Sequence, residues 1–289
     1  MLYFFLFFAF FSVVQLYADE LSLYEMPVDV TVPVVVNETP QAGKRVRFTT
    51  PNWEETNVYH TLYLPTGWTK RSKLPVIVEF PGNGGYRNGQ DFSDGTVDGC
   101  VLGYGLSGGE GAIWVCLPFV KEDQNKLSNC EKWWGNVEKT KQYCIETVKD
   151  VCFRFGGDSR RVILAGFSRG SIGCFYIGLR DDDIAGLWSG FFCHAHLDGV
   201  NEKWGYAGAD RKSALERLKR LGTRPVWFSQ EGKLDTTKKY LENTGFAEQF
   251  EIEPFHYPNH TATWILRDLP IRKKARLWFK KINESHNKN

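Results

Sequence analysis

The sequence predicts an α/β fold, with a mostly parallel central sheet of about eight strands and helices on both faces. From Lys44 onward, short runs rich in β-branched and aromatic residues alternate with longer helical patterns. Several of these runs, such as residues 75–80 and 161–165, are apolar without alternation, which is expected of strands covered on both faces. A chain of 289 residues that is 42% hydrophobic is also long enough to bury the core of one such domain.

The predicted elements follow one another in a regular order. Strands are predicted over residues 45–49, 58–64, 75–80, 112–117, 161–167, 190–194, 225–229 and 250–255. Helical periodicity predicts helices over residues 137–155, 171–179, 210–221, 237–243 and 271–282. We find no internal repeat or linker, so we expect an extension over residues 19–43, one domain over 44–284 and a tail over 285–289. Ligands of such sheets bind beyond the carboxyl ends of the strands, where functional side chains are therefore expected.

The first residues are typical of an export signal. Residues 1–14 are almost continuously apolar, and Ala18 precedes a polar segment that begins with Asp19. The pattern predicts a signal peptide over residues 1–18, cleaved after Ala18, although no basic residue precedes the apolar run. The alternative is an uncleaved anchor, but the run is shorter than the roughly 20 residues that span a bilayer. We expect a secreted protein without stable membrane insertion.

Seven cysteines and three glycosylation sequons agree with export. In an exported chain the cysteines predict disulfides, and the odd count leaves at least one thiol without a partner in the same chain. Cys174 lies in an apolar stretch and is expected to be a buried thiol. The sequons begin at Asn37, Asn259 and Asn283. They predict a glycoprotein, but a glycan on Asn259 would crowd a candidate catalytic residue, so that sequon is expected to be unused.

The charge balance argues against nucleic acid as a partner. A formal net charge of +2 gives no long-range field that would gather nucleic acid or anionic lipid. The basic stretch over residues 272–281 does not change this expectation, because its apolar residues recur at helical spacing and predict a helix docked on the core. The oligomeric state is left open.

The most specific motif is the segment Gly-Phe-Ser-Arg-Gly over residues 166–170, which fits the G-x-S-x-G nucleophile elbow. In such an elbow a sharp turn from strand to helix exposes the serine oxygen, and the glycines let the backbones approach. Residues 105–109 match the same pattern, but Ser107 lies in a glycine-rich loop before a predicted strand. Ser168 follows the strand over 161–167 and is the predicted nucleophile.

A serine hydroxyl needs a base within hydrogen-bond reach and an acid that fixes the tautomer of that base. Where the nucleophile occupies this kind of turn, the acid and then the histidine follow it along the chain. His260 follows the last predicted strand by a short loop. It is preferred to His256, which falls at the end of the strand itself, and to His286 in the tail.

The acid is expected in the loop after the strand over residues 225–229. Asp235 is the leading candidate there and completes the predicted triad, with a helix cap as its alternative role. Two competitors remain: Glu231 lies closer to the strand, and Asp198 follows the strand before it.

A tetrahedral intermediate also needs backbone N–H donors aimed at its oxyanion. The loop over residues 81–85, Pro-Gly-Asn-Gly-Gly, directly follows a predicted strand and can present one. We assign Asn83 and the N–H of Arg169 to the oxyanion hole, with a plain glycine turn as the alternative for the loop. Whether the Arg169 side chain contacts substrate is left open.

Four further residues are candidates for substrate binding. His194 and His196 have the separation of two metal ligands, but alternate residues of a strand share a face without a metal, and we expect none. His196 and Asp198 are instead predicted to line the pocket. The adjacent Trp133 and Trp134 can stack on a sugar ring or cover an acyl chain, but burial in the core or against a neighbouring loop is the preferred interpretation.

On these residues the region 44–282 resembles the α/β-hydrolases, especially the secreted feruloyl esterases and polyhydroxybutyrate depolymerases. That branch carries its acid in a Gly-x-x-Asp segment, which residues 232–235 fit. Its histidine lies in a Tyr-Pro-x-x-Gly-His segment near a Trp, which residues 257–260 with Trp264 fit in a shorter form. Residues 81–82 are Pro-Gly where the branch has His-Gly at the oxyanion loop.

The resemblance implies an α/β-hydrolase fold and hydrolysis of carboxylic esters through an acyl-enzyme, without a cofactor. The resemblance does not identify the substrate, for which we expect a small-molecule ester or an ester attached to a polysaccharide. The alternatives are a peptidase of the same fold and an inactive hydrolase-like binding protein. The presence of all three triad candidates argues against the second alternative.

Overall fold

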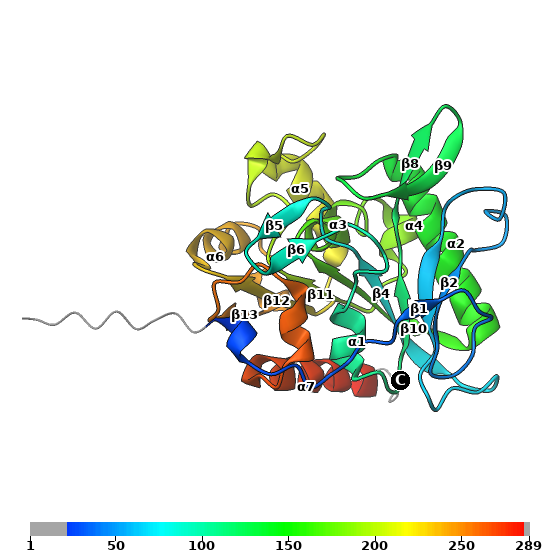
Figure 1. Ribbon diagram of the computed structural model, residues 1–289. Coiled ribbons are helices and arrows are strands. Elements are labelled where there is room, and N and C mark those ends of the chain that lie inside the picture. The colour runs from blue at the N-terminus through cyan, green and yellow to red at the C-terminus, as the bar shows by residue number, and fades with distance from the viewer. Residues whose placement is uncertain (1–21, 286–289) are drawn as a thin grey trace, which may run out of the picture.

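A large, mostly parallel sheet forms the centre of the protein (Figure 1). The computed structural model describes residues 22–285, so the predicted signal peptide lies outside the described residues. In spatial order the strands of this sheet are β1 (Val35–Val36), β2 (Arg45–Phe48), β3 (His60–Tyr63), β7 (Ile113–Cys116), β4 (Leu74–Phe80), β10 (Gly157–Phe167), β11 (Gly190–His194), β12 (Val226–Glu231) and β13 (Phe250–Phe255). Strand β3 is antiparallel to both neighbours, and all other pairs are parallel. The predicted fold class is confirmed.

Burial explains why the strands are nearly continuous apolar runs. After Leu74, every residue of β4 is buried, and the seven residues from Arg161 to Phe167 in β10 are buried except for the first. All eight predicted strands are present. The short edge strand β1 was not predicted, and β12 continues two residues beyond the predicted end at Ser229, to Glu231.

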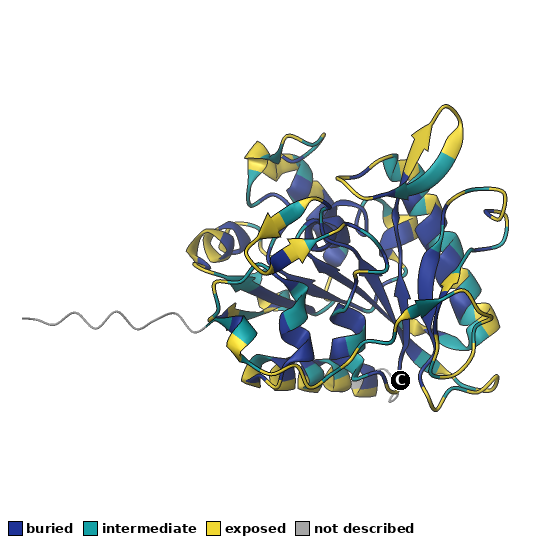
Figure 2. Ribbon diagram, viewed as in Figure 1, coloured by how far each residue is buried: buried dark blue, intermediate teal, exposed yellow. Residues whose placement is uncertain are grey.

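Helices cover both faces of the sheet (Figure 2). The helices are α1 (Leu102–Ser107), α2 (Val137–Phe155), α3 (Arg169–Tyr176), α4 (Asp182–Ala185), α5 (Arg211–Leu218), α6 (Asp235–Glu242) and α7 (Pro270–Ser285). Helices α1 and α7 pack into one apolar core, and α2 to α6 pack into the other core on the opposite face. The five predicted helices are found at these positions, and the basic α7 buries its apolar side. Within residues 22–285, no helix is both long and apolar enough to cross a membrane.

Helix α2 has the boundaries that the sequence predicted, because both of its ends are capped. The side chain of Asn136 accepts a hydrogen bond from the N–H of Lys139 at the start of the helix. Gly156 ends the helix in the left-handed conformation with φ 74°. The short helices α1 and α4 lack enough turns for a clear periodicity and were not predicted.

Two hairpins rise from the same side of the molecule, above the sheet (Figure 1). One consists of β5 (Tyr86–Asn88) and β6 (Asp91–Ser93), and the other of β8 (Phe119–Asp123) and β9 (Lys126–Cys130). Both follow strands of the central sheet at their carboxyl ends, so they form the surroundings of any site at that edge.

The N-terminal extension packs against the domain. Leu23, in the short 3-10 helix Leu23–Glu25, is fully buried, and its N–H donates to the side chain of Asn259 over 2.9 Å. The hydroxyl of Tyr24 donates to Asp91 over 2.8 Å. The extension thus contacts the loop that carries the predicted catalytic histidine.

The structure corrects the prediction of disulfides. All seven cysteines are free, and six of them are buried. Cys174 is a fully buried thiol, as predicted.

Candidate active site

Ser168 lies at the turn between β10 and α3, at the carboxyl edge of the sheet. Its backbone has φ 54° and ψ −117°, a conformation that non-glycine residues rarely adopt. The N–H of Ser168 donates to the carbonyl of His194 over 2.9 Å, which joins the turn to the neighbouring strand. The serine has the geometry of a nucleophile elbow. Ser107 instead ends α1, where its hydroxyl donates to the carbonyl of Gly103 over 3.0 Å.

The structure brings His260 to Ser168. The distance from Nε2 of His260 to Oγ of Ser168 is 3.0 Å, within hydrogen-bond range. The ring lies between Phe167 and Tyr86, with centroid distances of 4.7 and 4.9 Å. Asp91 of β6 accepts a hydrogen bond from the backbone N–H of His260 over 3.0 Å, so the loop is fixed as well as the ring.

The acid beside His260 is Glu231, and the prediction of Asp235 was wrong in this respect. The Nδ1 atom of His260 is hydrogen-bonded to Oε1 of Glu231. Strand β12 extends to Glu231 and places its carboxylate at the edge of the sheet, next to His260. Asp235 begins α6 and is exposed, beside a separate cavity that Arg211 and Lys239 also line.

The surroundings of Glu231 keep it ionised. Burial raises the pKa of this carboxyl, but the hydrogen bond from His260 and the electrostatic interactions with the rings of His194 and His260 outweigh burial and lower the pKa to about 2. A carboxylate in this position accepts the Nδ1–H of His260, which leaves the lone pair of Nε2 directed at Ser168. Serine, histidine and glutamate therefore form one hydrogen-bonded chain.

The two predicted oxyanion residues lie at this serine. Asn83 and Arg169 line a cavity of about 190 Å³ together with Ser168 and His260. Arg169 is the first residue of α3, so its N–H has no acceptor within its own helix. The side-chain oxygen of Asn83 accepts from the N–H of Trp133 over 2.7 Å and fixes the loop after β4.

The side chain of Arg169 points away from this cavity into the protein. It is 1% exposed, lies 4.2 Å from the ring centroid of Phe119 and donates to the carbonyls of Trp133 and Gly95 over 2.8 and 3.3 Å. The guanidinium therefore holds two loops beside the site and offers no charge to a substrate.

Of the four residues predicted to bind substrate, two line the cavity. His196 lies there, and so does Trp133, which is 40% exposed and has φ 50°. Sequence reasoning missed three further lining residues, namely Tyr86, Ile172 and Trp204. The aromatic residues in these loops could have been noticed in the sequence. The sequence does not show, however, that loops distant in the chain meet at one cavity.

Asp198 and Trp134 are structural, which corrects the prediction that Asp198 lines the pocket and agrees with the preferred interpretation of Trp134 as a buried residue. Asp198 is 3% exposed and accepts hydrogen bonds from Arg217 and Tyr206 over 2.8 and 2.6 Å. Trp134 is 6% exposed and packs on Tyr176, with ring centroids 4.8 Å apart.

His194 and His196 do not face each other across a common site. His194 ends β11 and is fully buried, with Nδ1 2.9 Å from the hydroxyl of Ser229. His196 lies beyond the strand, where its ring contacts Trp204 and His260 at centroid distances of 4.8 and 5.1 Å. Ala195 between them has φ 86°, which ends the alternation of a strand and separates the two rings.

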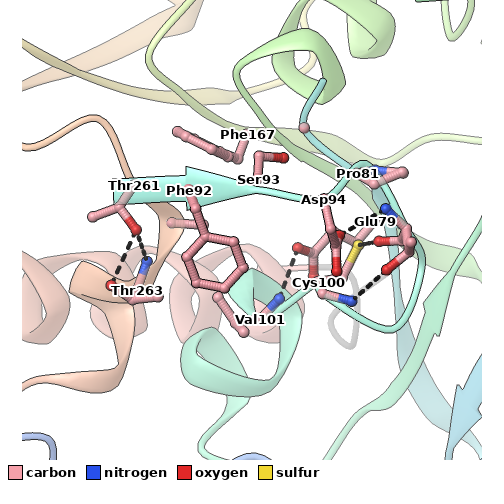
Figure 3. A pocket seen from close by; sticks show the side chains of 14 residues that line it. Glu79, Pro81, Phe92, Ser93, Asp94, Cys100, Val101, Phe167, Thr261 and Thr263 are labelled. Atoms are coloured by element: carbon pink, nitrogen blue, oxygen red, sulfur yellow. Dashed lines mark hydrogen bonds between the residues drawn. The ribbon is translucent and has the colours of Figure 1, made fainter. Parts of the chain in front are cut away.

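A second cavity, of about 100 Å³, lies behind the elbow (Figure 3). It is bounded by Phe167, which precedes the serine, by Thr261, which follows the histidine, and by Glu79 and Cys100. Glu79, Cys100 and Cys116 have side-chain atoms that could bind a metal ion, and these atoms all lie within 4.8 Å of one another. Among the described residues this is the one group of three or more potential metal ligands.

This group does not suit a cation. The oxygens of Glu79 accept hydrogen bonds from the backbone N–H groups of Val101, Leu102 and Gly103 and from the indole of Trp114. The guanidinium of Arg45 also lies 3.6 Å from the sulfur of Cys116. Glu79 therefore caps the N-terminus of α1 through these hydrogen bonds.

Two buried histidines and the half-buried His196 predict that the protein loses stability in acid. Burial lowers the pKa of His60 to about 3, and burial together with the charge of His260 lowers the pKa of His194 and His196 to about 4. Because these folded-state values lie below the unfolded value of 6.5, the unfolded chain binds protons first as the pH falls below 6.5. Each histidine then lowers the free energy of unfolding by up to about 1.4 kcal/mol per pH unit until its folded pKa is reached.

We expect urea denaturation midpoints to fall from pH 7 to pH 5, and the variant His60→Phe to show a shallower fall than the wild type. Equal midpoints across this range would contradict the expected neutral state of the buried histidines.

Solved structures with a similar fold include ester and peptide hydrolases. An S-formylglutathione hydrolase from Agrobacterium tumefaciens matches with a TM-score of 0.58 and 14% identity, over 88% of this chain and 99% of that one. A fungal esterase from Rhizomucor miehei matches with a TM-score of 0.57 and 13% identity, over 90% and 87%. A dipeptidyl peptidase 4 from Porphyromonas gingivalis matches with a TM-score of 0.53 and 13% identity, over 82% and 35%. The chain has the α/β-hydrolase fold.

At the level of sequence, the chain is similar to carboxylesterase 1E from Rattus norvegicus. The two are 29% identical over an alignment of 153 residues, and the match covers 48% of this chain. The match spans about a quarter of that protein, 25% of its length. No protein-family model matches the chain.

Proposed function

We propose that the protein is a secreted serine hydrolase that cleaves carboxylic esters through an acyl-enzyme. Ser168 is the nucleophile, His260 the general base and acid, and Glu231 the residue that orients His260. The proposal rests on the hydrogen-bonded chain of these three residues at a strand-to-helix turn, with 3.0 Å between the hydroxyl and the imidazole. The esterase names of the similar proteins agree with it.

In acylation, Nε2 of His260 takes the proton of Ser168 while Oγ attacks the ester carbonyl carbon. The N–H groups of Arg169 and Asn83 are proposed to bind the oxyanion of the tetrahedral intermediate. The intermediate expels the alcohol, which receives the proton from His260. Water then attacks the acyl-serine with the same base, and Ser168 regains its proton as the carboxylic acid leaves. Glu231, ionised throughout, stabilises the imidazolium that forms in both halves.

The cavity favours a small, uncharged ester. It measures about 190 Å³, and its described lining combines the aromatic rings of Tyr86, Trp133 and Trp204 with the imidazole of His196. No carboxylate lines the cavity within residues 22–285, so it offers no partner for the ammonium group of a peptide N-terminus. The flat rings suit an acyl group or a sugar that stacks, including an ester attached to a polysaccharide.

Export is part of the proposal, and the sequons differ in accessibility. Asn37 is exposed, whereas Asn283 is 8% exposed and donates from its side chain to the carbonyl of Phe279 over 2.8 Å. The side chain of Asn259 accepts from Leu23 and lies 3.4 Å from Asp91. A glycan on the exported protein is therefore expected at Asn37 alone among the three sequons.

Labelling with a fluorophosphonate probe tests the nucleophile. The wild type and Ser107→Ala are expected to label, and Ser168→Ala is expected not to label, because the probe reacts with an activated serine. A panel of model esters of increasing acyl length, with matching amides, then ranks the substrates. Labelling that survives in Ser168→Ala would overturn the proposal, and faster cleavage of amides than of esters would favour a peptidase.

A further inference from the structure

Behind the triad, two buried polar atoms face each other without a hydrogen-bond partner. The hydrogen bond to His260 uses Oε1 of Glu231 and leaves Oε2 buried and unpaired. The Nε2 atom of His194 is also buried and unpaired, and it lies 3.9 Å from that oxygen. A buried carboxylate oxygen without a hydrogen-bond partner lowers the stability of the folded protein. The nearby Nε2 of His194 is a potential donor that could compensate for this loss.

Among the described residues, the Nε2 atom of His194 has no hydrogen-bond partner. The ring is fully buried and packs against Phe167, Phe255 and Trp264, with centroid distances of 5.9, 5.1 and 5.4 Å. The other ring nitrogen, Nδ1, lies 2.9 Å from the hydroxyl of Ser229, its register partner on β12. The imidazole is thus clamped by apolar rings with one edge toward Ser229 and the other toward Glu231.

The proton positions follow from this arrangement. Burial lowers the pKa of His194 to about 4, so the ring is neutral near pH 7 and carries one N–H. If Ser229 donates its hydroxyl proton to Nδ1, the N–H lies on Nε2 and points at the ionised Glu231. The other tautomer would set a lone pair against a carboxylate, which is repulsive. The charge of Glu231 therefore selects the tautomer with the proton on Nε2.

We propose that His194 is a positioning residue, whose Nε2–H holds the second carboxylate oxygen of Glu231 and so aligns Glu231 with His260. The inference rests on the proposed function and extends it by one further residue, Ser229, whose hydroxyl can donate to Nδ1 and so supports the tautomer that Glu231 selects. At 3.9 Å the contact is longer than a hydrogen bond, so the Nε2–H acts on the ionised carboxylate as a dipole aimed at a charge. The backbone of His194 already holds Ser168, so one residue supports both ends of the triad.

The test compares His194→Phe with His194→Gln on a model ester that the wild type hydrolyses. Phe keeps the ring shape but removes the donor, so kcat is expected to fall about ten-fold or more with KM unchanged, as for other supporting partners of catalytic groups. Gln restores an N–H donor and is expected to recover part of kcat. Ser229→Ala removes the hydroxyl beside Nδ1 and leaves the imidazole in place. Nδ1 can then carry the proton more readily, so kcat is expected to fall by a smaller factor.

The matched control is His60→Phe. His60 is another fully buried histidine, hydrogen-bonded through Nδ1 to the hydroxyl of Tyr143 over 2.8 Å, and it does not line the active-site cavity. It is expected to lose stability and to keep kcat. Wild-type kcat in His194→Phe would overturn the inference. So would wild-type kcat in Ser229→Ala if His194→Phe does not fold. Either result leaves the proposed function intact, because that function fails only if Ser168→Ala retains labelling and hydrolysis.

Discussion

Replacing Glu231 by Gln is expected to lower kcat for ester hydrolysis by about a thousand-fold or more. The amide keeps the size of the side chain but removes the charge that stabilises the imidazolium of His260. It can also present an NH₂ group to Nδ1, which would place the proton of His260 on Nε2 and point it at Ser168. Steady-state kinetics with a model ester would measure the loss, and KM is expected to change little because Glu231 does not line the cavity.

Asp235→Asn is the matched control for this change. Asp235 lies only four residues further along the chain, is exposed and has no hydrogen bond to His260. Surface substitutions of this kind change the free energy of unfolding by about 0.5 kcal/mol at most. Because Asp235 neither contacts His260 nor lines the active-site cavity, kcat is expected to stay within about two-fold of the wild type. A large loss in Asp235→Asn together with near-normal activity in Glu231→Gln would show that the acid is Asp235.

The contrast between these two carboxylates shows what the sequence could not determine. Both follow the same predicted strand, and residues 232–235 also fit the segment that carries the acid in the resembling family. The choice depends on where β12 ends. Its pairing with β13 continues to Glu231 opposite Phe255, and this long-range contact extends the strand by two residues beyond Ser229.

Features that depend on local sequence were predicted well. The elbow serine needs a strand, a turn with small residues and a helix, all within about twenty consecutive positions. The position of His260 follows from the end of β13 in the same way. Both predictions use short-range periodicity and turn chemistry, which a single sequence contains.

Features that depend on partners far apart in the chain were not predicted. Asp91 holds the backbone of His260 across 169 positions, and Arg217 pairs with Asp198 across 19. The second of these contacts removes Asp198 from the pocket, because its carboxylate is used inside the protein. Likewise, Trp134 is buried while its neighbour Trp133 reaches the cavity, a difference set by the hairpin that both residues follow.

The glycines of the elbow are expected to be as necessary for folding as Ser168 is for catalysis. A Cβ atom at Gly170 would lie 2.1 Å from the carbonyl oxygen of Phe80, and one at Gly166 would lie 2.2 Å from the carbonyl carbon of Gly170. These contacts are with backbone atoms of β4 and of the elbow itself, which cannot move aside as a flexible side chain would. Gly166→Ala and Gly170→Ala are each expected to lower the free energy of unfolding by about 3 kcal/mol or more.

Chemical denaturation of both variants, beside Gly67→Ala, would measure this effect. A Cβ at Gly67 meets no heavy atom within 4 Å, so that variant is expected to remain within about 0.5 kcal/mol of the wild type. If an elbow variant were as stable as Gly67→Ala, the backbone of the turn would have to move apart until the new Cβ atom reached ordinary van der Waals contact. Ser168 would then leave its strained backbone conformation, and its Oγ would lose the position 3.0 Å from His260 on which the proposed chemistry depends.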